Sequence, residues 1–543
     1  MNPSVYRKVA YLAALVALLF PMAWLGAPAT RGGPGQPDDP GGKLAQLRSE
    51  AKLGQADLGA IDPASETIRM ATLGLRGLAV TMLWNKANEF KKTEDWTAFQ
   101  ATLEQLAKLQ PYFVKVWQYQ AWNLSYNVSV ELDDVRDGFY YVKQGIQYLQ
   151  QGTQYLRDNP TLLDDLGWFC GNKVGRADEK MLYRRMFKLD EELHAPDVEP
   201  VRRDNWLVSR EWYEEAISAI DDKKQSLGTK NPVTFFDSPA RSQMSYAEAI
   251  QEEGTLVSRW KSAWAEGGRL WREYGERLMP STQGFLIALG DEERLQEQAE
   301  QKLLELEELS PGLALTLRRE AEEALSAEQR KLLTQMPIEP TDEEMQLRDQ
   351  AAEAVNITPK KIADRIAREA PDQARTARRL ASEYAEIQQR LNAISTSRDV
   401  ANYEYWRIRC GIEQTDEALE ARRLTIDAQR AAEIADLDSA IAKYERSFEL
   451  WAAALAKFPE LDSDSSFGDD LLEFVKAYSE VLGRNELSLE DPDVADRFAL
   501  WEIVEANDNE RKFAAALNAR HERRTGIPLG TESLLNPADG ILD

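Results

Sequence analysis

Apolar residues recur along this chain at the spacing of one helix face, separated by short polar breaks. The first run places residues at i, i+3, i+4, i+7 and i+8: Leu75, Leu78, Ala79, Met82 and Leu83. A second run follows the polar break at 93–95 and contains Trp96, Phe99, Leu103 and Leu106. This period is that of an amphipathic helix, so the two runs predict an αα-hairpin.

The first helix of each successive pair carries a related signature around a tryptophan. The three copies are Leu83-Trp84-Asn85, Ala121-Trp122-Asn123 and Gly167-Trp168-Phe169. The tryptophans are spaced by 38 and 46 positions, and pairs tend to end at a proline, as at Pro111 and Pro160. Repeats in this range are typical of helical solenoids, in which each hairpin buries its apolar face by stacking on the next.

Residues 75–195 resemble divergent tetratricopeptide repeats, with small residues at Ala121 and Gly167 where helices must pack closely. The spacing departs from that family because the second hairpin carries an acidic insertion at 129–137. The stretch 75–194 also resembles an uncharacterised family of membrane-anchored proteins from planctomycete-type bacteria, through residues 122–129 and 175–179. The resemblance implies an all-α, TPR-like repeat domain, which we place at 61–285.

A stripe of aromatic residues near the end of this predicted domain is a candidate partner-binding site. Its members follow at i, i+4, i+11 and i+14: Trp260, Trp264, Trp271 and Tyr274. Two interpretations fit this spacing. The stripe is either a core seam against the preceding repeats or a groove that holds a partner protein or peptide.

A charged, aromatic-poor region is predicted at 286–400. Within it five residues step by four and three positions, as in a short coiled coil: Leu380, Tyr384, Ile387, Leu391 and Ile394. This seam predicts either an antiparallel pair of helices within one chain or a zipper between two chains. Further helical hairpins are expected at 401–525, where Ile441, Tyr444, Phe448, Trp451 and Leu455 line one face.

The N-terminal segment 1–29 predicts export or membrane attachment. Arg7 and Lys8 precede an uncharged stretch at 9–27, long enough for one hydrocarbon core. Pro21 and the small residues around Ala29 also fit a cleaved signal peptide, so both an anchor and a signal remain open. Positive charge on the N-terminal side places the body outside the cytoplasm in either case, that is, in the periplasm. Residues 30–60 predict a flexible Gly/Pro linker and 526–543 a disordered tail.

Charge and composition narrow the classes of ligand. The chain has 543 residues and a formal charge of −26, which argues against nucleic-acid binding because that needs clustered Lys and Arg. Its two cysteines, Cys170 and Cys410, and two histidines, His194 and His521, cannot supply the four ligands of a typical zinc site. A metal site built from carboxylates alone stays open, and no cofactor is expected.

Catalytic motifs are missing from the sequence: it has no phosphate-binding glycine loop, nucleophile elbow or zinc-protease motif. The best polar constellation contains Asp164, Asp165, Arg176, Asp178, Glu179, Arg184, Arg185 and His194. These residues suit acid–base chemistry, but charges placed at helix ends are the favoured explanation. The sequence therefore favours a membrane-tethered, non-enzymatic scaffold for protein–protein interaction. An envelope enzyme using paired carboxylates and a self-assembling structural protein are the alternatives.

Overall fold

The computed structural model describes residues 76–526 except 336, 338–339 and 462–463, together with the isolated positions 25, 41–43 and 46. The predicted membrane or signal segment 1–29, the linker 30–60 and the tail 526–543 lie outside these residues, apart from those isolated positions and Gly526. No helix within the described part is both long enough and apolar enough to cross a membrane.

The described chain is almost entirely helical, as the hydrophobic pattern predicts. It divides into two compact units, and the boundary along the chain lies between Gly228 and Thr229. The helices of unit 1 are α4 (Arg76–Lys92), α5 (Trp96–Leu109), α6 (Val114–Trp122), η2 (Asn123–Val128), α7 (Val135–Tyr155), α8 (Pro160–Trp168), η3 (Phe169–Lys173), α9 (Lys180–Leu189) and α10 (Asn205–Asp221). The segments η2 and η3 are π-helical and continue α6 and α8 without a break.

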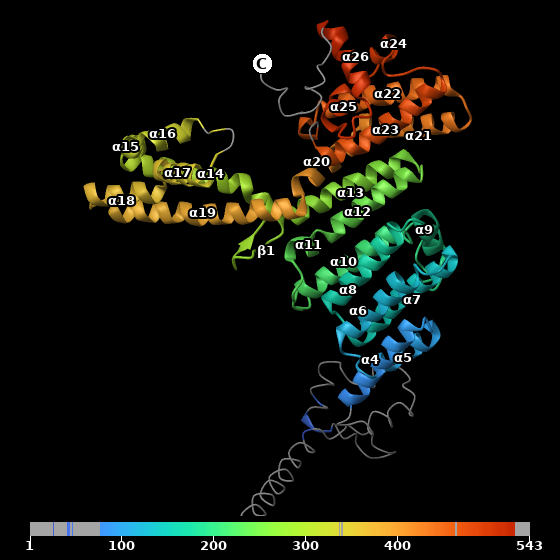
Figure 1. Cartoon of the computed structure of the whole chain (residues 1–543). Coiled ribbons are helices and arrows are strands. Elements are labelled where there is room, and N and C mark those ends of the chain that lie inside the picture. The colour runs from blue at the N-terminus through green and yellow to red at the C-terminus, as the bar shows by residue number, and fades with distance from the viewer. Residues whose placement is uncertain are drawn as a thin grey trace, which may run out of the picture. The chain divides into compact units, whose positions relative to one another are not determined.

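Unit 1 consists of helices that pack on the next helix along the chain or, as α10 does on α8, on the next but one. Figure 1 shows α4, α6, α8 and α10 along one side of the unit and α5, α7 and α9 along the other. The helix boundaries follow local signals: the Asp95 carboxylate accepts from the Ala98 N–H at 3.0 Å, and Asn159 caps α8 with Pro160 in its first turn. Along α6 and η2, Trp117, Ala121 and Leu124 share one face and are buried.

Unit 2 begins with α11 (Pro232–Phe236), α12 (Ser238–Glu252) and α13 (Val257–Glu276). A two-stranded antiparallel ribbon follows, β1 (Met279–Pro280) with β2 (Leu286–Ile287), and then the 3₁₀ turn η4 (Leu289–Asp291). The predicted repeat domain at 61–285 is therefore divided, since 229–285 belong to unit 2. The physical reason is that α13 packs against α12 and α20 (Tyr403–Glu413), both in unit 2.

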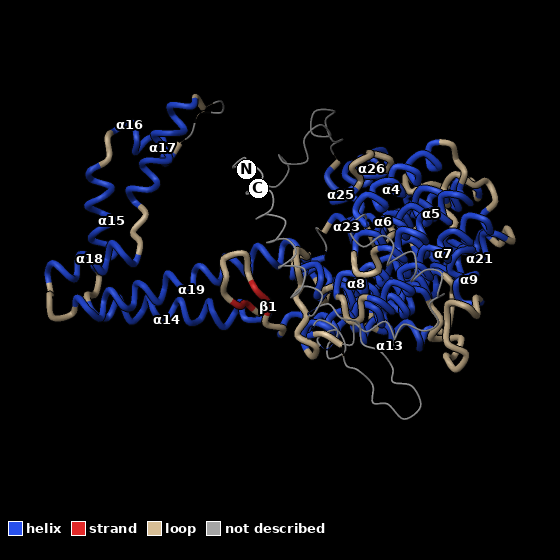
Figure 2. The backbone as a smooth tube through the Cα atoms, turned by 90° about the horizontal axis from the view of Figure 1, so that it is seen from below, coloured by secondary structure: helices blue, strands red, loops and turns tan. Residues whose placement is uncertain are grey.

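The charged region at 286–400 contains two long helices that lie side by side, α14 (Glu292–Leu309) and α19 (Ala374–Ala401) (Figures 1 and 2). Four shorter helices connect them: α15 (Leu313–Ala324), α16 (Ala327–Thr334), α17 (Asp342–Val355) and α18 (Pro359–Glu369). Ion pairs join Lys302 to Glu383 at 3.2 Å and Arg398 to Glu292 at 2.7 Å, which fixes the two long helices as antiparallel. The predicted seam at 380–394 lies on α19, and its first residue, Leu380, is buried in a core with Leu306 of α14.

The remaining helices are α21 (Asp416–Glu433), α22 (Leu437–Leu455), η5 (Pro459–Leu461), α23 (Ser465–Arg484), α24 (Pro492–Ala495), α25 (Trp501–Asn507) and α26 (Ala514–Thr525). The face predicted for α22 is confirmed, because all five of its residues are buried in one core. The chain after α23 forms three short helices, α24, α25 and α26, with breaks between them. Asp508 ends α25 by accepting from the Lys512 and Phe513 N–H groups, and Arg511 takes a left-handed φ of 55°.

Candidate functional site

The aromatic stripe of α13 lies in the core of unit 2. Trp260, Trp264 and Trp271 expose 1% or less of their surface and Tyr274 exposes 4%. The Trp260 indole N–H donates to the Ile250 carbonyl at 3.1 Å, and the Tyr274 hydroxyl donates to the Val233 carbonyl at 2.9 Å. Buried in this way, the four side chains have no surface left for a partner. The structure corrects their assignment as partner-binding residues to packing residues.

Two members of the polar constellation, Arg184 and His194, are held by structural partners outside it. Arg184 is buried and pairs with Asp204 at 3.0 Å and with the Asn205 side chain at 2.7 Å, which anchors the start of α10. The His194 Nε2–H donates to the Phe187 carbonyl at 2.8 Å, and burial lowers the pKa of this imidazole. Within the described residues, no group of three or more His, Cys, Asp or Glu side chains could hold a metal ion.

A different set of aromatic side chains is exposed on unit 1. We define the aromatic row as Trp84 of α4, Tyr119 and Trp122 of α6, Tyr126 of η2 and Trp168 of α8. Trp122 exposes 48% of its surface, Trp168 46% and Tyr119 37%, while Trp84 and Tyr126 are partly buried. Large exposed aromatic groups in one place are unusual for a surface that only meets water.

Direct contacts fix the aromatic row across neighbouring helices. The rings of Trp122 and Tyr126 stack with centroids 4.1 Å apart and planes 13° from parallel. The Trp168 indole N–H donates to the Tyr126 hydroxyl at 2.9 Å. Trp84 meets Tyr119 edge to face at 5.0 Å. Such ring pairs stabilise one arrangement beyond simple burial, so the row is a preformed surface.

The π-helical segment η2 determines which way Tyr126 faces. A π-helical turn holds one residue more than an α-helical turn, and the Ser129 N–H donates to the Leu124 carbonyl, five residues back, at 3.2 Å. Helix α7 packs closely against this segment at Gly145, where a Cβ would collide with the Ser125 side chain of η2. Segments of this kind occur often at functional sites. A second one, η3, follows Trp168 directly.

Each helix of the aromatic row also carries a lysine near its tryptophan. Lys91 follows Trp84 by seven positions and Lys115 precedes Trp122 by seven, spacings that share one helix face. Lys173 follows Trp168 by five positions, one π-helical turn on. The Lys91 ammonium donates to the Asn123 side chain at 3.0 Å. Cations therefore border the aromatic surface on all three helices.

Lys173 is the most enclosed of the three lysines, with 9% of its surface exposed. Its Nζ lies 4.8 Å from the centre of the Tyr126 ring, a cation–π arrangement. Burial lowers the pKa of the Lys173 ammonium, and the charges of Glu179 and Asp178 offset part of that effect. Burial also raises the pKa of Tyr126, to about 12, so its hydroxyl stays protonated at neutral pH.

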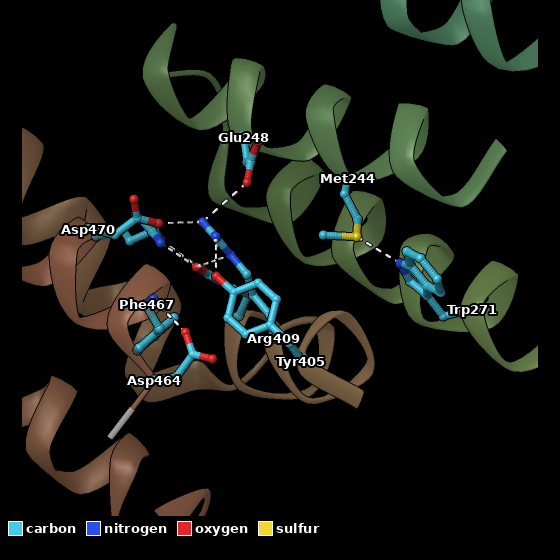
Figure 3. A network of polar contacts seen from close by, with 10 residues as sticks. Met244, Glu248, Trp271, Tyr405, Arg409, Asp464, Phe467 and Asp470 are labelled. Carbon is cyan, nitrogen blue, oxygen red and sulfur yellow. Dashed lines mark hydrogen bonds and ion pairs between the residues drawn. The ribbon is translucent and has the colours of Figure 1, made fainter. Parts of the chain in front are cut away.

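A network of charged residues in unit 2 surrounds Arg409. Figure 3 shows Arg409 of α20 between Glu248 of α12 and Asp470 of α23, at 3.1 and 2.6 Å. Arg409 also donates to the Tyr405 hydroxyl at 2.8 Å. Because one guanidinium holds both carboxylates, they act as ion-pair partners that join three helices.

No protein-family model matches this chain, and the comparisons with curated proteins and with solved structures give no match either. The candidate site therefore rests on its own residues. The sequence does mark it, since the repeated signature contains Trp84, Trp122 and Trp168. The signal that separates these from core residues is their position: Trp122 lies off the face that Trp117, Ala121 and Leu124 define.

Proposed function

We propose that this chain is a non-enzymatic, TPR-like helical-repeat scaffold that binds another protein through the aromatic row of unit 1. The observation that supports this most is the exposure of Trp122 and Trp168 in a preformed surface. Trp and Tyr are the residues that contribute most to protein interfaces, because each buries much area while losing little conformational freedom.

The rigidity of the aromatic row supports binding rather than accidental exposure. The Trp122–Tyr126 stack and the Trp168–Tyr126 hydrogen bond order these side chains before a partner arrives. Ordering them in advance lowers the entropy lost on association. Buried side chains beneath the row, among them Trp117 and Phe169, hold it in place.

The proposal includes the location of the scaffold. We infer from the sequence that residues 9–27 either anchor the chain in a membrane or direct its export, with the helical body on the extracytoplasmic side. The partner is then another extracytoplasmic or envelope protein.

Site-specific photo-crosslinking in the intact membrane tests this function. A benzophenone amino acid replaces Tyr119, which is exposed on the row, and in a matched control it replaces Tyr140, which is exposed on α7. We expect one reproducible crosslinked protein from position 119 and none of that species from position 140. The product should disappear when Trp122→Ala and Trp168→Ala are introduced into a chain that keeps its helical circular dichroism.

Crosslinking that is equal from both positions contradicts the proposal. So does crosslinking from position 119 that survives both tryptophan substitutions, because the row would then not be the contact surface.

A further inference from the structure

The aromatic row presents hydrogen-bond donors that no residue of the described chain satisfies. Lys173 has three N–H donors, yet none of those residues accepts a hydrogen bond from it: its ammonium lies over the face of the Tyr126 ring, and Glu179 and Asp178 act on it only through their charge. The Tyr126 hydroxyl accepts from Trp168, and none of the described residues accepts the hydroxyl's own hydrogen. Two adjacent donors without acceptors call for an acceptor from outside.

The burial of Lys173 indicates that the missing acceptor is an anion. A buried ammonium normally has an anionic partner, because losing its hydration costs far more than a ring face returns. The Lys173 Nζ also keeps access to solvent, since it is not among the fully enclosed polar atoms. A ligand can therefore reach it without unfolding the site.

Two lysines elsewhere on unit 1, Lys143 and Lys223, have carboxylate partners. Lys143 lies between Asp190 and Glu192 at 2.7 and 3.0 Å, and Lys223 pairs with Asp158. Within the part of the chain that the structure describes, Lys91, Lys115 and Lys173 have no such ion pair. In a chain with a formal charge of −26, these cations mark a surface complementary to an acidic partner.

We propose that the aromatic row binds an acidic peptide segment of its partner, with an Asp or Glu side chain at Lys173 and an apolar or aromatic side chain against Trp122 and Trp168. This inference rests on the proposed function and specifies the chemistry of the partner. The carboxylate accepts from the Lys173 ammonium and the Tyr126 hydroxyl, and Lys91 and Lys115 attract the flanking acidic residues.

Selection from a random peptide library displayed on phage tests the inference, with the full chain in detergent as bait. Both ends of each peptide are fused within the displayed protein, so that the only carboxylates the peptide offers are those of its side chains. We expect the selected peptides to be enriched in Asp and Glu beside Phe, Leu or Trp. Binding of a selected peptide should weaken about tenfold in Lys173→Met and should weaken further as salt rises. Lys223→Met, which removes a cation that already has a partner on the surface of unit 1, should bind as the unaltered chain does.

Lys115, which is exposed, and Lys91, which is half-buried, keep the test independent of folding. If Lys173→Met fails to fold, the double variant Lys91→Met and Lys115→Met removes charge from the border of the row and should also lower affinity for acidic peptides. Selected peptides without acidic enrichment, or with equal affinity for all lysine variants, would overturn the acidic-segment inference while leaving the scaffold function in place. A selection that yields no peptide, or only peptides that ignore Trp122→Ala, would overturn both.

Discussion

The Trp168 indole N–H donates to the Tyr126 hydroxyl at 2.9 Å, which connects the tryptophan of α8 to the tyrosine of η2. The same tyrosine stacks on Trp122 and meets the edge of Phe169. Tyr126 is thus the central residue of the aromatic row, and its hydroxyl can be removed without changing the ring.

Tyr126→Phe should lower the free energy of unfolding of unit 1 by about 0.5–1.5 kcal/mol, the usual contribution of one hydrogen bond. Partner affinity should fall as well, because Trp168 loses the contact that orients its ring. Urea denaturation measures the first effect and crosslinking yield the second. Tyr140→Phe is the control, and an equal loss in that variant would mean that the Tyr126 hydroxyl has no special role.

Gly167→Ala should destabilise unit 1 by about 1–3 kcal/mol, because it overfills a closely packed contact. A Cβ at this position would lie 2.7 Å from the ring of Tyr213 on α10, where the Ser209 hydroxyl also donates to the Gly167 carbonyl at 2.6 Å. Gly483→Ala is the matched control, since that helical glycine is exposed and a Cβ there meets nothing. It should stabilise its own unit by about 0.5–1 kcal/mol, and urea midpoints distinguish the two outcomes.

Arg409→Met should destabilise unit 2 by about 1–3 kcal/mol, because it removes the donor shared by Glu248, Asp470 and Tyr405. The half-exposed carboxylates can still reach water, which keeps the loss below that of a fully buried pair. Arg446→Met breaks an exposed pair with Glu449 and should change stability by less than about 0.5 kcal/mol. Thermal denaturation that ranks the two variants equally would show that Arg409 does not join the helices.

Burial of His194 should make unit 1 less stable in mild acid. Because burial lowers the pKa of this imidazole, the unfolded chain binds a proton more readily than the folded chain. The free energy of unfolding should therefore fall as pH decreases through about 6.5, by at most about 1.4 kcal/mol per pH unit, and level off below the folded pKa. Replacing His194 by Gln removes this slope, and urea titrations at several pH values measure it. An unchanged slope in the variant would assign the pH dependence to other groups.

The two cysteines should resist alkylation in the folded protein. Both thiols are free and buried, and burial raises the pKa of Cys170 to about 12 and that of Cys410 well above its ordinary value. The reactive species is the thiolate, which is then scarce at neutral pH. Iodoacetamide followed by mass spectrometry should label neither cysteine until urea is added. Rapid labelling of the native protein would contradict the buried positions.

The sequence predicts the helical faces well where burial alone defines them. The residues of α22 from Ile441 to Leu455 recur at helical spacing and pack together, because an apolar face must be covered. The same reasoning cannot decide what covers a face. Trp271 reaches the core because α20, far along the chain, brings Tyr403 against it, and helical periodicity within α13 carries no information about that helix.

In the sequence, the aromatic row is marked only by the repeated tryptophan signature, which does not show that these tryptophans are exposed. Tryptophan is large and apolar, so composition alone predicts burial for Trp122 as well as for Trp117. Trp117 is buried and Trp122 is exposed because the two lie five residues apart on one helix, which turns the Trp122 side chain away from the core face. The hydrophobic pattern does not show the π-helical turn, which packs closely against Gly145 of another helix.

The π-helical segments make the aromatic row sensitive to chain length. A π-helical turn holds one residue more than an α-helical turn, so deleting one residue from 123–125 would return that turn to α-helical geometry. Trp122 and Tyr126 would then be three positions apart instead of four, which changes the angle between their side chains. Tyr126 would then leave Trp122, although every side chain of the row would still be present. The connection at 129–134, outside any helix, can gain or lose residues without this effect. Insertions and deletions should therefore be tolerated unequally over this short stretch, with the boundary near Val128.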